Sequence, residues 1–242
     1  MQILLTVAYD GTNYAGWQRQ ENAVAVQEIV ENTLAELLGC PVVVRAASRT
    51  DAGVHALGQR VAFFADGLKV PLDKLPVVLS GMLPADISVL AAQVVADDFN
   101  PRFNPVAKTY AYRIHSAPCP NPLLLRYAAH VPQELNLAKM QKAAQAFVGR
   151  HDFAAFCAAG SSAKTTVREV YSCQVDFADD VYTLTIRGNA FLYNMVRIVA
   201  GTVVYAGLGK VDDVPGIIAS LDRAQAGKTM PPQGLTLLRV EY

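Results

Sequence analysis

The chain has 242 residues, of which 52% are hydrophobic, 17% are charged and 8% are aromatic, and it carries 21 basic and 21 acidic side chains. This composition is typical of a folded globular protein and excludes a disordered chain, a collagen-like repeat and a highly charged tail. The length allows one large domain or two of modest size, and either arrangement can bury a substantial core.

The neutral total hides a difference between the two halves of the chain. Residues 1–105 carry a net charge of −4, and residues 106–242 carry a net charge of +4. The mildly basic second half permits a face that binds nucleic acid, whereas a surface drawn from both halves would be neutral.

The cysteine pattern and the apolar stretches indicate the cellular setting. The four cysteines lie far apart, none belongs to a C-x-x-C pair, and no signal segment precedes the first strand. We therefore expect a reduced, cytoplasmic protein. The most apolar stretch, at 188–209, contains Arg197, so we expect no membrane span. The histidines and cysteines lack the spacing of metal ligands, and no metal site is expected.

In the first half, apolar and β-prone residues predict a strand at 2–10 that ends at the turn-forming Asp10-Gly11. Apolar residues then recur at helical spacing over Val26–Leu38, and Gly39 closes this predicted helix. The remaining expected elements are strands at 42–48 and 58–65, a helix at 72–82 and a strand at 87–95.

The second half repeats this order of strand, helix, strand and strand. The expected elements are a strand at 108–115, a helix at 136–148, strands at 166–177 and 181–189 that meet at a turn, helices at 191–206 and 214–222, and a strand at 235–242. The sequence thus predicts an α+β protein of two similar α/β sandwich halves, residues 1–105 and 106–242. Each half would be a mainly antiparallel sheet backed by helices, with an active-site cleft between the halves.

One segment, SRTDAGVHALGQ at residues 48–59, has the residue types for catalysis. It places Arg49 two positions before Asp51 in a glycine-containing loop between two strands. A nearby guanidinium favours the ionised form of a carboxylate, which can then act as a nucleophile or a general base. The same pair also occurs as a structural ion pair or a turn cap, and the residue types alone favour that interpretation.

Six segments, in this order along the chain, resemble one known family. They are YDGTNYAGWQRQ at 9–20, SRTDAGVHALGQ at 48–59, FNPRFNPVAKTYAYRI at 99–114, GRHDFAAF at 149–156, FLYNMVRIVAG at 191–201 and GKTMPPQGLTLLRVEY at 227–242. Together they resemble the TruA family of tRNA pseudouridine synthases over essentially the whole chain, and RTDAGVHA is the most diagnostic part.

The resemblance implies a pseudouridine synthase fold and an enzyme that isomerises uridine to pseudouridine at positions 38, 39 and 40 of the tRNA anticodon stem and loop. It implies an aspartate nucleophile, no cofactor and no metal. The partners that it implies are tRNA and a second copy of the chain in a homodimer. The alternative from another class is a non-catalytic RNA-binding module that uses a sheet with exposed aromatic rings as a platform.

The resemblance also implies the roles of four residues. The family's nucleophile falls on Asp51, and the arginine that pairs with it falls on Arg197. Arg49 matches the arginine associated with RNA contact and with the flipped base, and Tyr110 matches the active-site tyrosine. Asp51 would attack the anomeric carbon or the base, or promote formation of a glycal, and these routes remain open.

Residue types alone would give two of these positions a structural role. An arginine within an apolar helix is usually structural, although a buried guanidinium needs an anion such as Asp51. Tyr110 on an alternating strand would more often be an ordinary sheet residue, so its role depends on the resemblance.

The loop before the second half departs from the family pattern at Pro101 and Asn104, where the family commonly has alanine and serine. This departure bears on the details of RNA contact. Other basic side chains are candidates for contacts to phosphates, although residue type alone favours a solvated surface position for most of them. These residues include Arg19, Arg45, Arg102, Lys108, Arg113, Arg126, Arg150, Lys164 and Arg168.

Overall fold

The computed structural model describes residues 1–242, which divide into two compact units. The first unit consists of Met1–Val106 together with Leu237–Tyr242, and the second consists of Ala107–Thr236. The division expected from the sequence assigns the C-terminal residues to the second half. They pack in the first unit because strand β10 (Leu235–Glu241) lies beside β3 (His55–Phe64) in the sheet.

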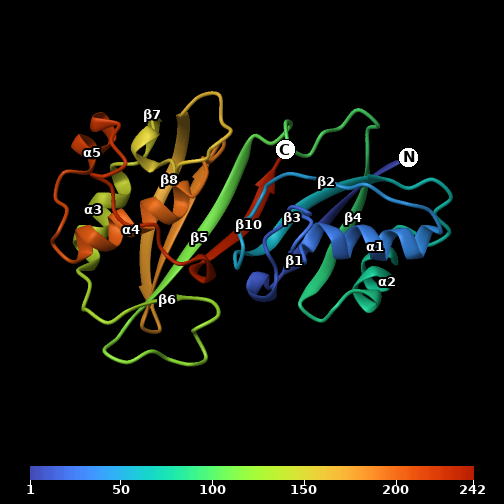
Figure 1. Cartoon of the computed structure of the whole chain (residues 1–242), viewed down its shortest axis with the longest axis horizontal. Helices are drawn as coiled ribbons and strands as arrows, with labels where there is room; N and C mark the ends of the chain where they lie inside the picture. The colour runs from blue at the N-terminus through green and yellow to red at the C-terminus, as the bar shows by residue number, and fades with distance from the viewer. The chain divides into compact units, whose positions relative to one another are not determined.

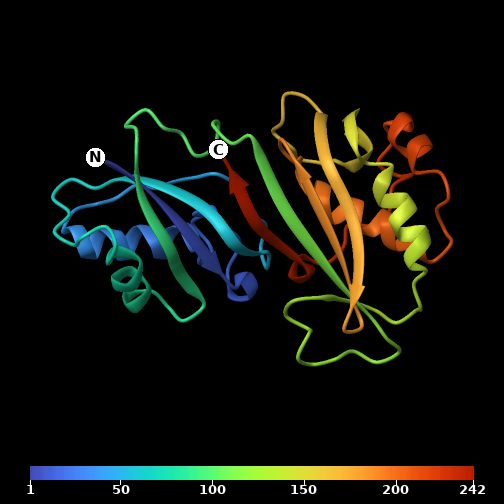
Figure 2. The ribbon, with the colours of Figure 1, turned by 180° about the vertical axis from the view of Figure 1, so that it is seen from behind.

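The first unit is a sheet with two helices on one face. Its strand order is β4-β1-β3-β10, and β2 also pairs with β3. Strands β2 and β4 are antiparallel to their partners β3 and β1, and β1 is antiparallel to β3. Figures 1 and 2 show both helices on the same side of these strands. The other elements of this unit are β1 (Gln2–Tyr9), β2 (Arg45–Ala46), β4 (Ile87–Val95), α1 (Val26–Leu38) and α2 (Leu75–Met82).

Helix α1 has the bounds that the sequence predicts. Its buried stripe includes Val26, Val30 and Leu34, which recur at the helical period. Gly39 ends the helix in the left-handed region, with φ of 70°, and its N–H donates to the Ala35 carbonyl at 2.9 Å.

The strands of the second unit follow the order β5-β9-β8-β7 in the sheet, and β6 also pairs with β5. All pairs are antiparallel except β5 with β6. Helices α3, α4 and α5 lie on one side of these strands (Figures 1 and 2). The bounds are β5 (Ala107–Ser116), β6 (Ala129–Val131), β7 (Gly149–Asp152), β8 (Val167–Ala178), β9 (Val181–Gly188), α3 (Leu137–Gln145), α4 (Met195–Gly207) and α5 (Val214–Ser220).

These units confirm the predicted α+β class, with mainly antiparallel sheets backed by helices. Strands β1 and β4 of the first unit and the β8–β9 hairpin of the second unit also lie where the sequence predicts them. The β8–β9 turn forms at Asp179 and Asp180, which adopt φ of 50° and 59°. Such angles suit the tight turn that joins two twisted strands.

Two predicted strands are wrong in length, and three helices are shorter than the predicted ranges 72–82, 136–148 and 214–222. The strand expected at 42–48 is reduced to Arg45–Ala46, because the Val44 N–H donates to the buried Glu31 carboxylate of α1, at 3.1 Å, instead of to a neighbouring strand. The strand expected at 58–65 begins earlier, at His55, because β1 continues to Tyr9 and pairs there with Ala56.

The helix expected at 191–206 is also wrong at its start, because α4 begins at Met195. Asn194 adopts φ of 58° in the left-handed region, which an α-helix cannot continue through. The short strands β6 and β7 and three 3₁₀ turns, Gly11–Asn13, Ala154–Phe156 and Pro232–Gly234, were not predicted. No helix combines the length and the hydrophobicity that crossing a bilayer requires.

Candidate functional site

Asp51 lies on the loop that connects β2 to β3 and is partly exposed. The start of this loop is tied to β3 by the buried Gln59 side chain, which donates to the Ser48 carbonyl at 2.7 Å and accepts from the Ser48 N–H at 3.2 Å. The Val54 N–H donates to the Asp51 carbonyl at 3.1 Å and closes a turn. The carboxylate is therefore carried on a short segment that is fixed at both ends.

The same loop is bound to the segment that follows β1. The Trp17 N–H donates to the Thr50 carbonyl at 3.1 Å, and the Gly53 N–H donates to the Tyr14 carbonyl at 3.3 Å. The Thr50 hydroxyl shares a buried hydrogen bond of 2.8 Å with the Tyr9 hydroxyl. These contacts hold the backbone on both sides of Asp51.

Gly16 makes this approach possible. Its φ is +91°, and a Cβ there would lie 2.5 Å from the Thr50 carbonyl oxygen and 3.0 Å from the carbonyl carbon of Asp51. Both the backbone conformation and the available space therefore require glycine.

Arg49 precedes Asp51 on this loop, and its side chain is exposed. It lines a cavity of about 260 Å³ on the first unit. The structure therefore brings Arg49 and Asp51 together on one loop, with Arg49 at the surface.

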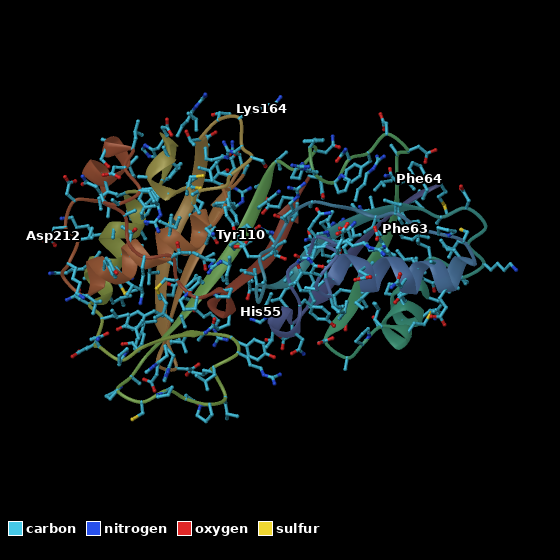
Figure 3. The ribbon with its side chains drawn as sticks, viewed as in Figure 1. His55, Phe63, Phe64, Tyr110, Lys164 and Asp212 are labelled. Atoms are coloured by element: carbon cyan, nitrogen blue, oxygen red, sulfur yellow. The ribbon has the colours of Figure 1, made fainter.

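Tyr110 and Tyr112 lie on β5 of the second unit and, being two residues apart, point to the same side of the strand. The Tyr110 ring is 6% exposed and packs edge-on against Phe191, with centroids 5.2 Å apart (Figure 3 labels Tyr110). The Tyr112 hydroxyl donates to the Pro231 carbonyl at 2.6 Å. Burial raises the pKa of Tyr112 well above its usual value, against an opposite effect of Arg197.

Arg197 lies in the first turns of α4, and two hydrogen bonds fix its guanidinium. Its Nε donates to the Met230 carbonyl and its Nη1 donates to the Asn194 side-chain oxygen, both at 2.7 Å. The Met230 N–H in turn donates to the Arg197 carbonyl at 3.2 Å. The segment at 230–231 thus connects Arg197 with Tyr112 of β5.

The structure places the four predicted residues in two pairs, with Arg49 and Asp51 in the first unit and Tyr110 and Arg197 in the second. The pairing of Arg197 with Asp51 remains a prediction. No group of three or more histidine, cysteine, aspartate or glutamate side chains is arranged to hold a metal ion. An ionisable carboxylate, a fixed guanidinium and an aromatic hydroxyl suit chemistry by nucleophilic attack and proton transfer.

The sequence analysis missed the residues that hold these groups in place. Gly16, Thr50 and Met230 all lie in segments that carry the family resemblance, but their contacts are made by residues distant in the sequence. Asn194 had a local signal, since it precedes Arg197 by three residues, which is within reach on a helical turn.

Comparison with known proteins gives matches over nearly the whole chain. A family model described as "tRNA pseudouridine synthase" matches residues 5–104 and 143–242. The chain is 47% identical to the tRNA pseudouridine synthase A of Ruminiclostridium cellulolyticum over 244 residues, covering 100% of this chain and 99% of that protein. Proteins of the same name from Thermoanaerobacter sp. and Geotalea uraniireducens are each 46% identical to this chain. The two alignments cover 99% and 100% of this chain, and each covers 99% of the other protein.

Among solved structures, the chain is similar to a chain of the archaeal box H/ACA sRNP Nop10-Cbf5 complex, with 12% identity and a TM-score of 0.46. The match covers 99% of this chain and 48% of that chain, so this chain spans about half its length. A score this low supports no conclusion about the site.

The close approach at Gly16 generates a test of the loop. We expect Gly16→Ala to lower the free energy of unfolding by about 2–5 kcal/mol, because it adds both an overlap with the Thr50 backbone and an unfavourable positive φ. Urea unfolding followed by the fluorescence of Trp17, the single tryptophan, measures this loss.

Gly39→Ala is the matched control. Gly39 also has a positive φ, but a Cβ there would meet nothing within 4 Å. This substitution should cost only about 1–2 kcal/mol. Equal losses for the two variants would show that Gly16 is needed for its backbone conformation alone.

Proposed function

Since the chain belongs to the tRNA pseudouridine synthase family, we propose that Asp51 is the catalytic carboxylate with which it isomerises uridine to pseudouridine in the anticodon stem-loop of tRNA. The observation that carries the assignment is the fixed position of Asp51, on a loop held by hydrogen bonds to Trp17 and Tyr14. Catalytic groups must be held close to their productive geometry, because small misplacements reduce the rate strongly.

The isomerisation needs a carboxylate beside the sugar and the base. The bond from ribose C1′ to N1 of uracil breaks, the base turns, and a bond from C1′ to C5 forms. The C5 proton leaves and N1 gains a proton, so the atoms balance without an oxidant, a reductant or a cofactor. An ionised Asp51 assists the first step by attack on C1′ or on the base, or by removal of a proton to give a glycal.

Tyr110 is proposed to act on the extruded uracil in two ways. Its ring stacks on the base, and its hydroxyl helps to move the C5 proton. Phe191 supports this role because its edge-on packing fixes the plane of the Tyr110 ring.

The two arginines are proposed to bind the substrate and the nucleophile. A base inside a helical arm must leave the stack, which costs a few kcal/mol. Arg49, exposed on the loop of Asp51, occupies the space that this base vacates. Arg197 pairs with Asp51, and its hydrogen bonds to Met230 and Asn194 hold the guanidinium in one orientation for that pairing.

We propose that the uridines modified are those at positions 38, 39 and 40 of the tRNA, as the resemblance to the family implies. The test is a set of tRNA transcripts with uridine at only one of these positions. Pseudouridine mapped by chemical modification and primer extension should appear at each of the three.

Asp51→Asn tests the assignment of the nucleophile. The substitution keeps the shape of the side chain but removes its charge, so we expect release of tritium from C5 of uridine in an unmodified tRNA transcript to fall at least about a thousandfold. Affinity for the tRNA should remain within about threefold of the original chain, since binding depends mainly on phosphate contacts.

Asp97→Asn is the control, because Asp97 is exposed and lies outside the loop. It should release tritium at the original rate. Equal rates for Asp51→Asn and the original chain would overturn the role of Asp51. A chain that binds tRNA and releases no tritium in any form would instead be a binding module.

Tyr110→Phe separates the ring from its hydroxyl. It retains the stacking surface, so we expect tRNA affinity to be unchanged and tritium release at saturating tRNA to slow by about 10²–10⁴-fold, the usual range for loss of a proton-transfer group. Tyr171→Phe, at a partly exposed tyrosine of β8, is the control. A Tyr110→Phe variant at full rate would leave the ring as the only contribution of this residue.

We further propose that the protein is a cytoplasmic homodimer that shares one tRNA between its two copies, as the resemblance to the family implies. In sedimentation equilibrium we expect the mass of two chains, about twice 26.1 kDa. A single-chain mass at the concentration used for the activity measurements would contradict the dimer.

A further inference from the structure

The cavity that Arg49 lines is a basic groove, and Arg49 is the only one of its lining side chains that has a role in the proposed chemistry. It lies wholly within the first unit, and its walls come from four segments. The lining residues are Trp17, Gln18, Gln27, Val44–Arg49, Asn100, Arg102 and Phe103. We call this cavity the arginine groove.

The arginine groove concentrates positive charge within an acidic part of the chain. Arg45, Arg49 and Arg102 line it, and no carboxylate does, although residues 1–105 have a net charge of −4. None of the three guanidinium groups forms a salt bridge. Nearby Arg19, in contrast, lies within 4 Å of the carboxylates of Glu28 and Glu31. Three unpaired guanidinium groups around one cavity are suited to bind an anion.

Phe103 adds an apolar ring at the same place. It is 76% exposed, and the Arg102 guanidinium lies over its face, 5.4 Å from the ring centroid. A large exposed apolar side chain beside free cations is unusual on a protein surface and is typical of surfaces that stack on unpaired bases.

The loop that carries this pair is held by its own hydrogen bonds. Asn104 accepts from the Asn100 N–H at 2.7 Å, and the Asn100 side chain accepts from the Arg102 N–H at 3.0 Å. The buried Pro101 accepts from the Tyr242 hydroxyl at 3.0 Å. Arg102 and Phe103 are therefore presented by an ordered turn, which reduces the entropy lost when a ligand binds.

The size of the arginine groove limits its ligand. At about 260 Å³ it is smaller than the roughly 300–1,000 Å³ of pockets for drug-sized molecules. This volume suits a single nucleotide, with its base on the Phe103 ring and its phosphates among the arginines. A paired segment of RNA would not expose the face of a base to this ring.

We propose that the arginine groove binds one unpaired nucleotide of the anticodon loop next to the target uridine, with its base stacked on Phe103 and its phosphates bound by Arg45 and Arg102. This inference rests on the proposed function, which supplies the RNA. Binding here would fix the register of the strand on the loop of Asp51, because the lining segment Val44–Arg49 leads directly into that loop.

The test compares variants for their affinity for an unmodified anticodon stem-loop RNA at several salt concentrations. Phe103→Leu should weaken binding about 5- to 150-fold, corresponding to the loss of one stacked base, without a change in salt dependence. Arg102→Gln should lower the slope of log affinity against log salt by about 0.7, which corresponds to one phosphate contact on a single strand.

Each variant has a matched control in the same unit. Phe64→Leu alters another exposed phenylalanine, which is 46% exposed, and Lys69→Gln removes an exposed charge away from the groove. Trp17 fluorescence checks that every variant is folded. Affinities of Phe103→Leu and Arg102→Gln equal to those of their controls would overturn the proposal.

Tritium release by the unaltered chain separates this proposal from the proposed function. If the chain releases tritium but both groove variants bind RNA normally, only the groove proposal fails. If it releases none while Phe103→Leu loses affinity and Arg102→Gln lowers the salt slope as expected, the groove is supported and the assigned reaction fails.

Discussion

The position of Asp51, the proposed catalytic carboxylate, depends on one contact between two stretches of backbone. The segment after β1 approaches Thr50 and Asp51 so closely that a Cβ on Gly16 would lie 2.5 Å from the Thr50 carbonyl. Hydrogen bonds from Trp17 and to Tyr14 complete the contact. Because backbone atoms make this contact, it holds the loop in place without using the Asp51 side chain. A surface loop thereby gains the order that catalysis requires.

The second unit fixes its groups in a different way, through side chains that bond to carbonyl oxygens. Arg197 donates to the Met230 carbonyl, and Tyr112 donates to the carbonyl of the next residue, Pro231. One short segment therefore orients a charged group of α4 and supports β5, the strand of Tyr110.

Local patterns in the sequence predicted the elements whose limits are set locally. Both ends of α1 follow from its apolar period and Gly39, and the β8–β9 hairpin follows from Asp179 and Asp180. The short length of β2 could not be predicted, because the Val44 N–H donates to the Glu31 carboxylate of α1, a tertiary contact that no local pattern shows. For the site, the residue types of segment 48–59 indicated Asp51 as a candidate, and the family resemblance gave its expected role, which stays a prediction. The roles of Gly16 and Phe103 required the fold, since each depends on neighbours far away in the sequence.

The return of the C-terminal residues to the first unit has a consequence for how the protein is made. A ribosome completes the N-terminal residues first, and domains generally fold as units during synthesis. Here Leu237–Tyr242 belong to the unit that begins at Met1, and Tyr242 binds the loop of Arg102 through Pro101. The second unit, Ala107–Thr236, is continuous and can form while the first still lacks its last strand. The unit that carries Asp51 is thus completed last, and a chain released a few residues early would lack the Tyr242 contact that supports the loop of Arg102.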